Sequence, residues 1–362
     1  KKNKRITILQ RIQTNLNKIM DKKQLLNLLN DTQENDNTLQ EGKRILLIDG
    51  LNLFFRNFAI MNMVNPDGIH IGGLGGFFRS LGAMIRQTQP DQVYVVFDGA
   101  GSTIGRKNLL PEYKSGRNEQ RVTNWEIFDD LNDEHDSKVD QIVRVIHYLK
   151  TLPVKTLILD KVEADDIIAY LCDKLPNHQD DKLFIVSSDK DFLQLVNKNV
   201  IVYRPMEKKY YTEDLIKEKY NMPAQNFILH KTLLGDNSDK IKGVKGLGEK
   251  GLMKKFPELS EGVMSFDDIL DICEKKYKDH VVYARIIQSV EDLEKNYTVM
   301  DLSNPMIGEN DKKWLDEVVK SEELNYIPEQ FIALYNEDKL GGMIRNLDYW
   351  LKENFEKLVI SK

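Results

Sequence analysis

The feature that most constrains this chain is a series of four short apolar runs separated by segments of helical periodicity. The runs are RILLIDG from residue 44, DQVYVVFDG from 91, VKTLILD from 154 and DKLFIVSSDKD from 181. Helical patterns lie between them at about 73–88, 137–150 and 165–175. Buried β-rich runs that alternate with helices predict an α/β fold with a parallel sheet covered on both faces. In such sheets, ligands bind outside the carboxyl ends of the strands.

Each of these runs has acidic residues at or just after its end. The third run leads into KVEADDIIAYL, residues 161–171, where three carboxylates stand in four positions before an apolar stretch. A helix N-terminus stabilises an acid by only about 0.3–1 kcal/mol, which explains one or two acids better than three that repel one another. Two further acids occur in LLGDNSDKIKG. The acids that we expect at one cleft are Asp49, Asp98, Glu163, Asp165, Asp166, Asp189, Asp191, Asp236 and Asp239.

A cluster of this size predicts bound divalent cations. Uncompensated carboxylates raise one another's pKa and destabilise a fold, whereas Mg²⁺ and Mn²⁺ prefer oxygen ligands. Nine acids exceed the needs of one ion, so we expect two. Metal pairs about 3.5–4 Å apart can clamp the attacking and leaving oxygens of a phosphodiester. The six histidines are scattered and suggest no Ser–His–Asp arrangement.

Two segments outside the strands carry basic charge. Residues 99–136 form a long stretch without a strand signal, which we interpret as a partly helical structure that reaches over the site. Residues 233–251 are rich in lysine and glycine. Their GVKGLGEKG motif fails as a P-loop, because Glu249 and Gly251 stand where Lys and Ser or Thr are required. The spacing suits a hairpin between helices whose N–H groups can hold a phosphate; an ordinary glycine-rich turn is the alternative.

Length, hydropathy and cysteine content indicate the number of domains and the cellular compartment. A length of 362 residues suggests two domains, and no apolar run approaches the roughly 18–20 residues of a membrane span. Cys172 and Cys273 stand alone, which favours a reducing compartment and therefore a cytoplasmic protein. Residues 1–41 form a separate basic extension with a helical apolar pattern and a polar linker. It either binds a partner or is an appendage docked loosely on the body.

Taken together, the motifs resemble the 5′-nuclease family of flap endonucleases and 5′→3′ exonucleases. LLIDG, VFDG, LLPEYKSGR, VEADD, VSSDKDF and GDNSDKIKGVKGLGEK occur in the order of that family. The chain is most similar to the T-even-phage-type ribonuclease H branch, which would place it in a host bacterial cytoplasm. The resemblance implies a parallel-sheet, PIN-like 5′-nuclease core with a helical arch, followed by a helical domain that contains a helix–hairpin–helix. The implied divisions are an extension over 1–41, a catalytic domain over 42–215 with its arch at about 99–136, and a helical domain over 216–362 with its hairpin motif at about 233–256.

The resemblance also implies roles for individual residues. A first metal site would take Asp49, Asp98, Glu163, Asp165 and Asp166, and a second would take Asp189, Asp191, Asp236 and Asp239. The implied ions are two Mg²⁺, for which Mn²⁺ can substitute, with K⁺ at the helix–hairpin–helix. Lys114 and Arg117 match arch residues that engage the scissile phosphate. The implied DNA contacts are Arg106, Tyr113, Lys242, Gly243, Lys245, Gly246, Gly248 and Lys250.

These features predict a divalent-metal-dependent 5′ nuclease for branched, nicked or flapped duplex DNA that also removes RNA from RNA–DNA hybrids. We expect a monomer without a membrane, acting in replication or repair with a single-stranded-DNA-binding protein or a sliding clamp. One alternative is a PIN-type ribonuclease, but such domains are much shorter and lack the hairpin. The other is a non-catalytic, structure-specific DNA-binding protein, which would be expected to have lost acids.

Overall fold

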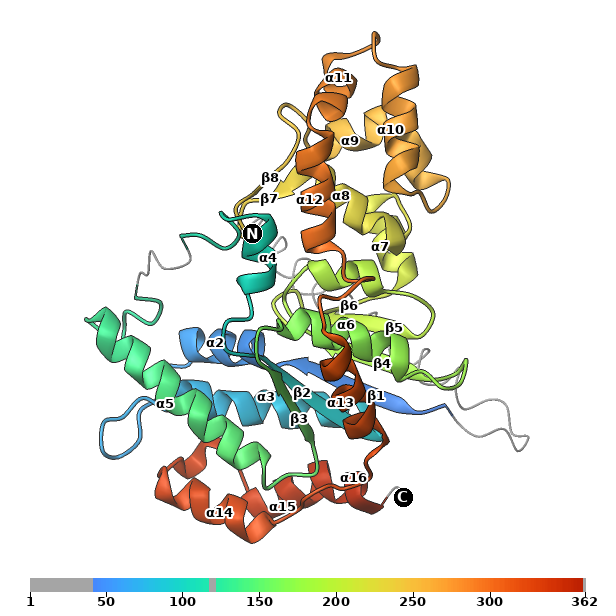
Figure 1. Ribbon diagram of the computed structural model, residues 1–362. Helices are drawn as coiled ribbons and strands as arrows, with labels where there is room; N and C mark the ends of the chain where they lie inside the picture. The colour runs from blue at the N-terminus through green and yellow to red at the C-terminus, as the bar shows by residue number, and fades with distance from the viewer. Residues whose placement is uncertain (1–41, 117–121, 361–362) are drawn as a thin grey trace, which may run out of the picture. The chain divides into compact units, whose positions relative to one another are not determined.

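The computed structural model describes residues 42–116 and 122–360 (Figure 1). Residues 43–362 form one compact unit, distinct from residues 1–42. The predicted helical extension over 1–41 lies outside the described residues. Among the helices that are described, none is both long enough and apolar enough to cross a membrane.

A six-stranded sheet forms the centre of this unit, in the order β3-β2-β1-β4-β5-β6. The first five strands pair in parallel, and β6 is antiparallel to β5. This arrangement confirms the predicted parallel-sheet core. The strands are β1 Arg44–Asp49, β2 Gln92–Asp98, β3 Lys155–Leu159, β4 Lys182–Val186, β5 Val200–Arg204 and β6 Lys209–Tyr211.

The apolar runs are continuous because both faces of the sheet are buried. In β1, Leu46 and Ile48 belong to one core, whereas Ile45 and Leu47 belong to the other. The first core packs under α2 (Gly50–Ile60), α3 (Gly72–Thr88) and α5 (Leu131–Leu149). The second packs under α6 (Ala164–Lys174), η1 (Asp191–Leu195), α7 (Glu213–Tyr220) and α13 (Glu309–Lys320).

A third apolar cluster lies beyond the carboxyl edge of the sheet and is built from helices (Figure 1). It includes residues of α8 (Phe227–Leu234), α9 (Glu249–Lys255), η3 (Pro257–Ser260), α10 (Phe266–Lys275), α11 (Val281–Gln288) and α12 (Val290–Met300). The turn η2 (Ala224–Asn226) precedes α8. A short two-stranded sheet, β7 (Gly235–Asp236) and β8 (Ile241–Lys242), follows it.

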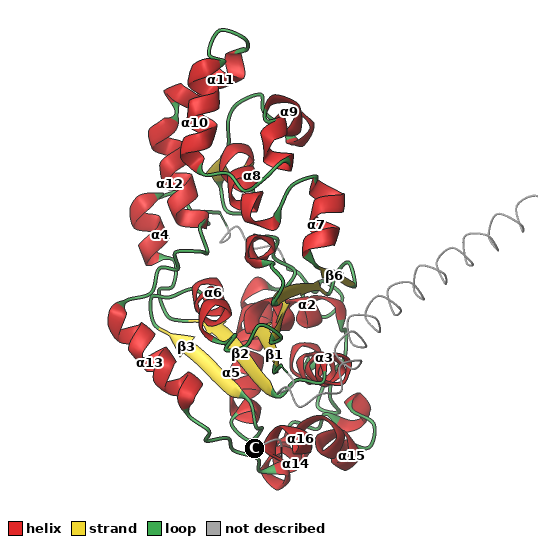
Figure 2. Ribbon diagram, turned by 90° about the vertical axis from the view of Figure 1, so that its right-hand side faces the viewer, coloured by secondary structure: helices red, strands yellow, loops and turns green. Residues whose placement is uncertain are grey.

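The last helices return to the sheet, so residues 216–362 do not pack as one helical domain, in contrast to the prediction. They are α14 (Pro328–Glu337), η4 (Gly341–Met343), α15 (Leu347–Leu351), η5 (Lys352–Glu356) and α16 (Lys357–Ile360). Figures 1 and 2 show α14, α15 and α16 on the side of the sheet away from α9–α11. The cause is aromatic packing: the ring of Phe331 lies 5.3 Å from that of Phe78 and 4.9 Å from that of Tyr148.

The segment between β2 and α5 is shorter than the predicted arch of 99–136. It contains α4 (Ile104–Leu109), followed by turns, and α5 already begins at Leu131. The earlier helix start has a local cause, because the Asp130 side chain accepts hydrogen bonds from the N–H groups of Asn132 and Asp133 at 2.7 and 3.2 Å. The acidic residues DDLNDEHD, 129–136, at the end of the range predicted for the arch therefore include a capped helix start.

Candidate active site

The predicted acids gather where the strands β1, β2 and β4 end and the helix α6 begins. Asp49 and Asp98 are the last residues of β1 and β2, while Asp189 and Asp191 follow β4. Burial, with the neighbouring Asp98 and Asp189 carboxylates, raises the pKa of Asp49 to about 7. Burial, with Asp189 and Asp49, raises the pKa of Asp165 well above its usual range. These shifts show that the acids of different strands lie close enough to repel one another.

Hydrogen bonds from two elements fix Asp49 in position. One carboxylate oxygen accepts the N–H of Asn52 at 3.1 Å, and the other accepts the Ser187 hydroxyl at 2.9 Å. The Asn52 side chain in turn accepts the N–H of Ser188 at 2.9 Å. Asn52 and Ser187 did not figure in the sequence prediction as site residues. They join the start of α2 to the end of β4 around this acid.

The N-terminus of α6 presents the triple of acids that the sequence singled out. Glu163 is the N-cap residue, and the exposed Asp98 accepts the N–H of Ala164 at 2.7 Å. Asp165 and Asp166 lie in the first turn. The helix dipole and its free N–H groups favour negative charge at this position.

Glu163 links α6 to the segment that follows α4. One of its carboxylate oxygens accepts the Tyr113 hydroxyl at 3.0 Å and the Lys114 ammonium at 2.9 Å. The Lys114 backbone N–H also donates to the Asp239 carbonyl at 2.9 Å. Lys114 therefore lies beside Glu163, one of the predicted acids, and its role at the phosphate stays a prediction. Arg117 lies outside the described residues.

Asp166 and Arg106, for which the sequence predicted a metal-ligand and a DNA-contact role, form a buried ion pair. Asp166 is 1 % exposed, and Arg106 is 4 % exposed. The guanidinium of Arg106 makes two bonds to the Asp166 carboxylate, at 2.5 and 3.0 Å, and donates to the Val299 carbonyl at 2.8 Å. Asp166 also accepts the N–H of Met306 at 2.9 Å. Arg106 is thus buried, and its bonds to Asp166 anchor it to α6. Tyr113, also predicted to contact DNA, is 4 % exposed and faces Glu163.

Lys231, which the sequence analysis missed, joins two acids of the predicted second metal site. Its ammonium contacts the carboxylates of both Asp191 and Asp236. Burial, with Asp189, raises the pKa of Asp191 to about 7, an effect that Lys231 opposes. For Asp236, Lys231 and Ser238 outweigh burial and lower the pKa to about 2. The available signal was a lysine within the mostly apolar segment FILHKTLL.

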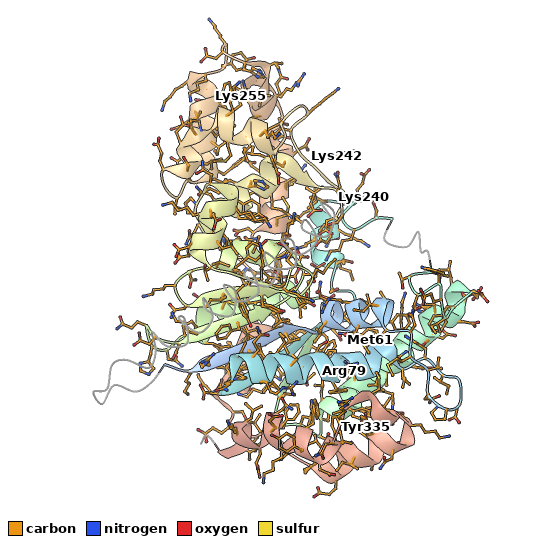
Figure 3. All side chains as sticks on the ribbon, turned by 180° about the vertical axis from the view of Figure 1, so that it is seen from behind. Met61, Arg79, Lys240, Lys242, Lys255 and Tyr335 are labelled. Atoms are coloured by element: carbon orange, nitrogen blue, oxygen red, sulfur yellow. The ribbon has the colours of Figure 1, made fainter. Side chains whose placement is uncertain are left out.

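The glycine-rich segment lies between α8 and α9 and exposes the lysines predicted to bind DNA. Lys242, Lys245 and Lys250 are exposed, and Figure 3 shows Lys242 beside Lys240 on this hairpin. Gly243 is required by close packing, since a Cβ there would lie 2.1 Å from the carbonyl carbon of Leu234. Gly246 adopts a φ of 84° and Gly248 is exposed and caps α9.

The donor set fits a hard cation, because it consists of carboxylate oxygens. One oxygen of Glu163, Oε1, is buried and has no hydrogen-bond partner among the described residues. Within residues 42–116 and 122–360, however, no three of these side chains already stand as the ligands of one ion.

The sequence matches known proteins across most of its described part. Residues 44–221 match the model of the 5′-3′ exonuclease N-terminal resolvase-like domain. A 5′-3′ exonuclease of Aquifex aeolicus is 28% identical over 313 residues, which cover 84% of this chain and 96% of that protein. A 5′-3′ exonuclease of Buchnera aphidicola is 30% identical over 220 residues, which cover 59% of this chain and 71% of that protein.

Longer relatives and solved structures share the same core. DNA polymerase I of Lactococcus lactis subsp. cremoris is 30% identical over 255 residues, which cover 67% of this chain but only 27% of the polymerase. The fold matches a flap endonuclease of bacteriophage T5, crystallised with DNA and metal ions, with a TM-score of 0.59 and 22% identity over 87% of this chain and 99% of that one. The strand order, the acidic edge and these relatives agree: the chain belongs to the 5′-nuclease family of 5′-3′ exonucleases.

Proposed function

We propose that this protein is a divalent-metal-dependent 5′ nuclease that hydrolyses phosphodiester bonds in nicked, branched or flapped duplex DNA. We also propose that it removes RNA from RNA–DNA hybrids during replication or repair. The observation that carries this proposal is the meeting of acids from β1, β2, β4 and α6 at one sheet edge with Lys114 among them. The T5 flap endonuclease with which the fold agrees was crystallised with DNA and metal ions, which supports the same substrate and cofactor here.

Two Mg²⁺ ions, or Mn²⁺ in their place, fit the donor set. Asp49, Asp98, Glu163 and Asp165 would hold the first ion. Asp189, Asp191, Asp236 and Asp239 would hold the second. When bound, such ions lower the pKa of water and stabilise charge on a phosphodiester. Asp166, which the sequence analysis placed with the first group, acts instead through Arg106 and fixes α4 against α6.

Lys114 would stabilise the negative charge that develops on the phosphate. Its ammonium rests on Glu163 at 2.9 Å, and its side chain is 13 % exposed. A fixed cation beside the reacting phosphate contributes most when charge develops in a water-poor site. Arg117 would assist it from the same segment of the chain.

The exposed lysines between α8 and α9 would bind the duplex away from the cut. Lys242, Lys245 and Lys250 supply charge, and the backbone of Gly243, Gly246 and Gly248 would lie near phosphates or a K⁺ ion. We propose action as a cytoplasmic monomer, alongside a single-stranded-DNA-binding protein or a sliding clamp. The T-even-phage-type branch remains our prediction for its subgroup.

One comparison of substrates tests the proposal. A 5′-labelled flap, a nicked duplex and an RNA–DNA hybrid are incubated with the protein in Mg²⁺ and in EDTA, and Asp165→Asn is tested in parallel. We expect cleavage only with Mg²⁺ and almost none with the variant, which should bind DNA as well as wild type or better. Binding without cleavage in Mg²⁺ would support a non-catalytic DNA-binding protein, and cleavage of single-stranded RNA alone would support a PIN-type ribonuclease.

A further inference from the structure

Lys231 occupies an unusual place for a lysine. It lies in α8, whose sequence FILHKTLL has five apolar residues among eight, and it is 8 % exposed. Its ammonium contacts Asp191 at the start of η1 and Asp236 in β7. A buried ammonium is costly unless it is paired. The helix therefore delivers one positive charge to the point where two acids from distant parts of the chain meet.

The Asp236 carboxylate and the Asp191 backbone are held by bonds that do not involve Lys231. One oxygen of Asp236 accepts the N–H and the hydroxyl of Ser238 at 2.7 and 2.6 Å. The N–H of Asp191 donates to the Asp189 carboxylate at 2.9 Å. Removal of the ammonium would leave the Asp236 carboxylate held by Ser238 and would leave the Asp191 carboxylate without its cation.

We propose that Lys231 is a built-in cation that occupies the second metal position in the metal-free protein and is displaced when a divalent ion binds there. This inference rests on the proposed function, because it assigns Asp191 and Asp236 to the second ion. An ammonium and a divalent ion repel each other when they share the same carboxylates. Lys231 therefore stabilises the empty site and sets the Mg²⁺ concentration at which the site fills.

A permanent structural ion pair is the competing interpretation, and it predicts the opposite effect on metal binding. If Lys231 only orients the acids, its loss should weaken binding of the second ion. If it competes, its loss should strengthen that binding and should lower the stability of the metal-free protein. The sign of the change in affinity separates the two.

The test uses the full chain without DNA, with Mn²⁺ as the probe. Wild type, Lys231→Met and Lys190→Met are titrated by calorimetry, with free Mn²⁺ followed by electron paramagnetic resonance. Lys190 is a matched control, because it is exposed and lies next to Asp189 and Asp191 in the sequence. We expect Lys231→Met to bind the second ion at least about tenfold more tightly, a change of roughly 1.4 kcal/mol. The first ion should bind unchanged, and Lys190→Met should behave like wild type.

Thermal unfolding supplies a second readout. Without metal, Lys231→Met should melt several degrees below wild type, and saturating Mn²⁺ should remove the difference. If the variant does not fold without metal, folding on addition of Mn²⁺ would support the exchange of ammonium for metal, and failure to fold with Mn²⁺ would overturn it. Lys231→Gln, whose amide can still donate to a carboxylate, should tighten the second ion in the same direction.

The outcomes also separate this inference from the proposed function. If wild type cleaves in Mg²⁺ but Lys231→Met binds the second ion no more tightly than wild type does, the inference about Lys231 is overturned and the proposed function stands. The same holds if wild type binds only one ion. Wild type that neither binds Mn²⁺ nor cleaves in Mg²⁺ would overturn the proposed function.

Discussion

Replacing Asp49 by asparagine should make the metal-free protein more stable while removing its activity. The Asp49 carboxylate is 8 % exposed, and its pKa is raised from 3.8 to about 7, first by burial and then by Asp98 and Asp189. A rise of about 3 units corresponds to roughly 4 kcal/mol of destabilisation when the group is ionised, at about 1.36 kcal/mol per unit. Asp49 accepts hydrogen bonds from Asn52 and Ser187, and the amide introduced by Asp49→Asn would weaken one of them, which costs about 1 kcal/mol. The expected net gain is about 3 kcal/mol.

The sign depends on pH. An acid whose pKa is raised on folding does not change the unfolding free energy below its unfolded pKa of about 3.9, because it is protonated in both states. As the pH rises to the folded pKa, the same acid lowers the unfolding free energy. In EDTA, wild type should therefore lose unfolding free energy between pH 4 and about 7, and the loss from Asp49 should be complete at pH 8. Asp49→Asn should show its gain at pH 8 and none at pH 4.

Urea unfolding followed by circular dichroism measures the difference. The matched control is Asp180→Asn, which neutralises an exposed acid before β4, at the opposite end of that strand from the site. It should change the unfolding free energy by no more than about 0.5 kcal/mol at either pH. Two results would refute repulsion between Asp49 and its neighbouring carboxylates. One is an Asp49→Asn variant that is no more stable than wild type at pH 8 in EDTA, and the other is an equal gain in unfolding free energy at pH 4.

Three further predictions concern other parts of the chain. Lys114→Ala should reduce the single-turnover cleavage rate far more than DNA affinity, whereas Lys245→Ala should weaken duplex binding and reduce the slope of log affinity against log salt by about 0.9. Rapid-quench kinetics measure the cleavage rates of the two variants, and salt titrations measure their DNA affinities. Equal effects of the two substitutions on the single-turnover rate would contradict the separate roles of Lys114 and Lys245. Arg106→Met should lower the unfolding free energy by about 3–5 kcal/mol, because it leaves the buried carboxylate of Asp166 unpaired. Denaturant unfolding measures this difference, and a change below about 1 kcal/mol would exclude an anchoring role for Arg106. A chain that starts at Gly42 should fold and cleave short flaps at close to the full-length rate, and an insoluble or inactive product would show that the core needs residues 1–41.

The sheet and its acidic edge could be predicted from the sequence because they depend on local patterns. A buried parallel strand needs a continuous apolar run, and the strand register then brings Asp49, Asp98 and Asp189 to one edge without further information. The N-terminus of α6 was predictable for a similar reason, since the change from acids to apolar residues occurs within 163–168. The metal-ligand roles drawn from this pattern remain predictions.

The partners of the acids could not be predicted, because they come from segments far apart in the chain. Arg106 is 60 residues from Asp166 and 193 from Val299, and no periodicity indicates that these residues meet. The resemblance implied a DNA contact for Arg106, and nothing in the sequence indicated that its side chain is buried. The return of Phe331 to the sheet was hidden for the same reason, since an amphipathic helix does not specify which surface it covers.

Side-chain cations offset the negative charge of some acids at the candidate active site more than that of others. Arg106 and Lys114 face Asp166 and Glu163 on α6, and Lys231 faces Asp191 and Asp236. The raised pKa of Asp49 and of Asp165 shows that negative charge stays poorly compensated where β1 and β4 end beside α6. A side-chain cation there would relieve the repulsion but would occupy the space beside the acids. Lys231 contacts the acids assigned to the proposed second ion, and the charge left on Asp49 and Asp165 is the charge that the proposed first ion would neutralise.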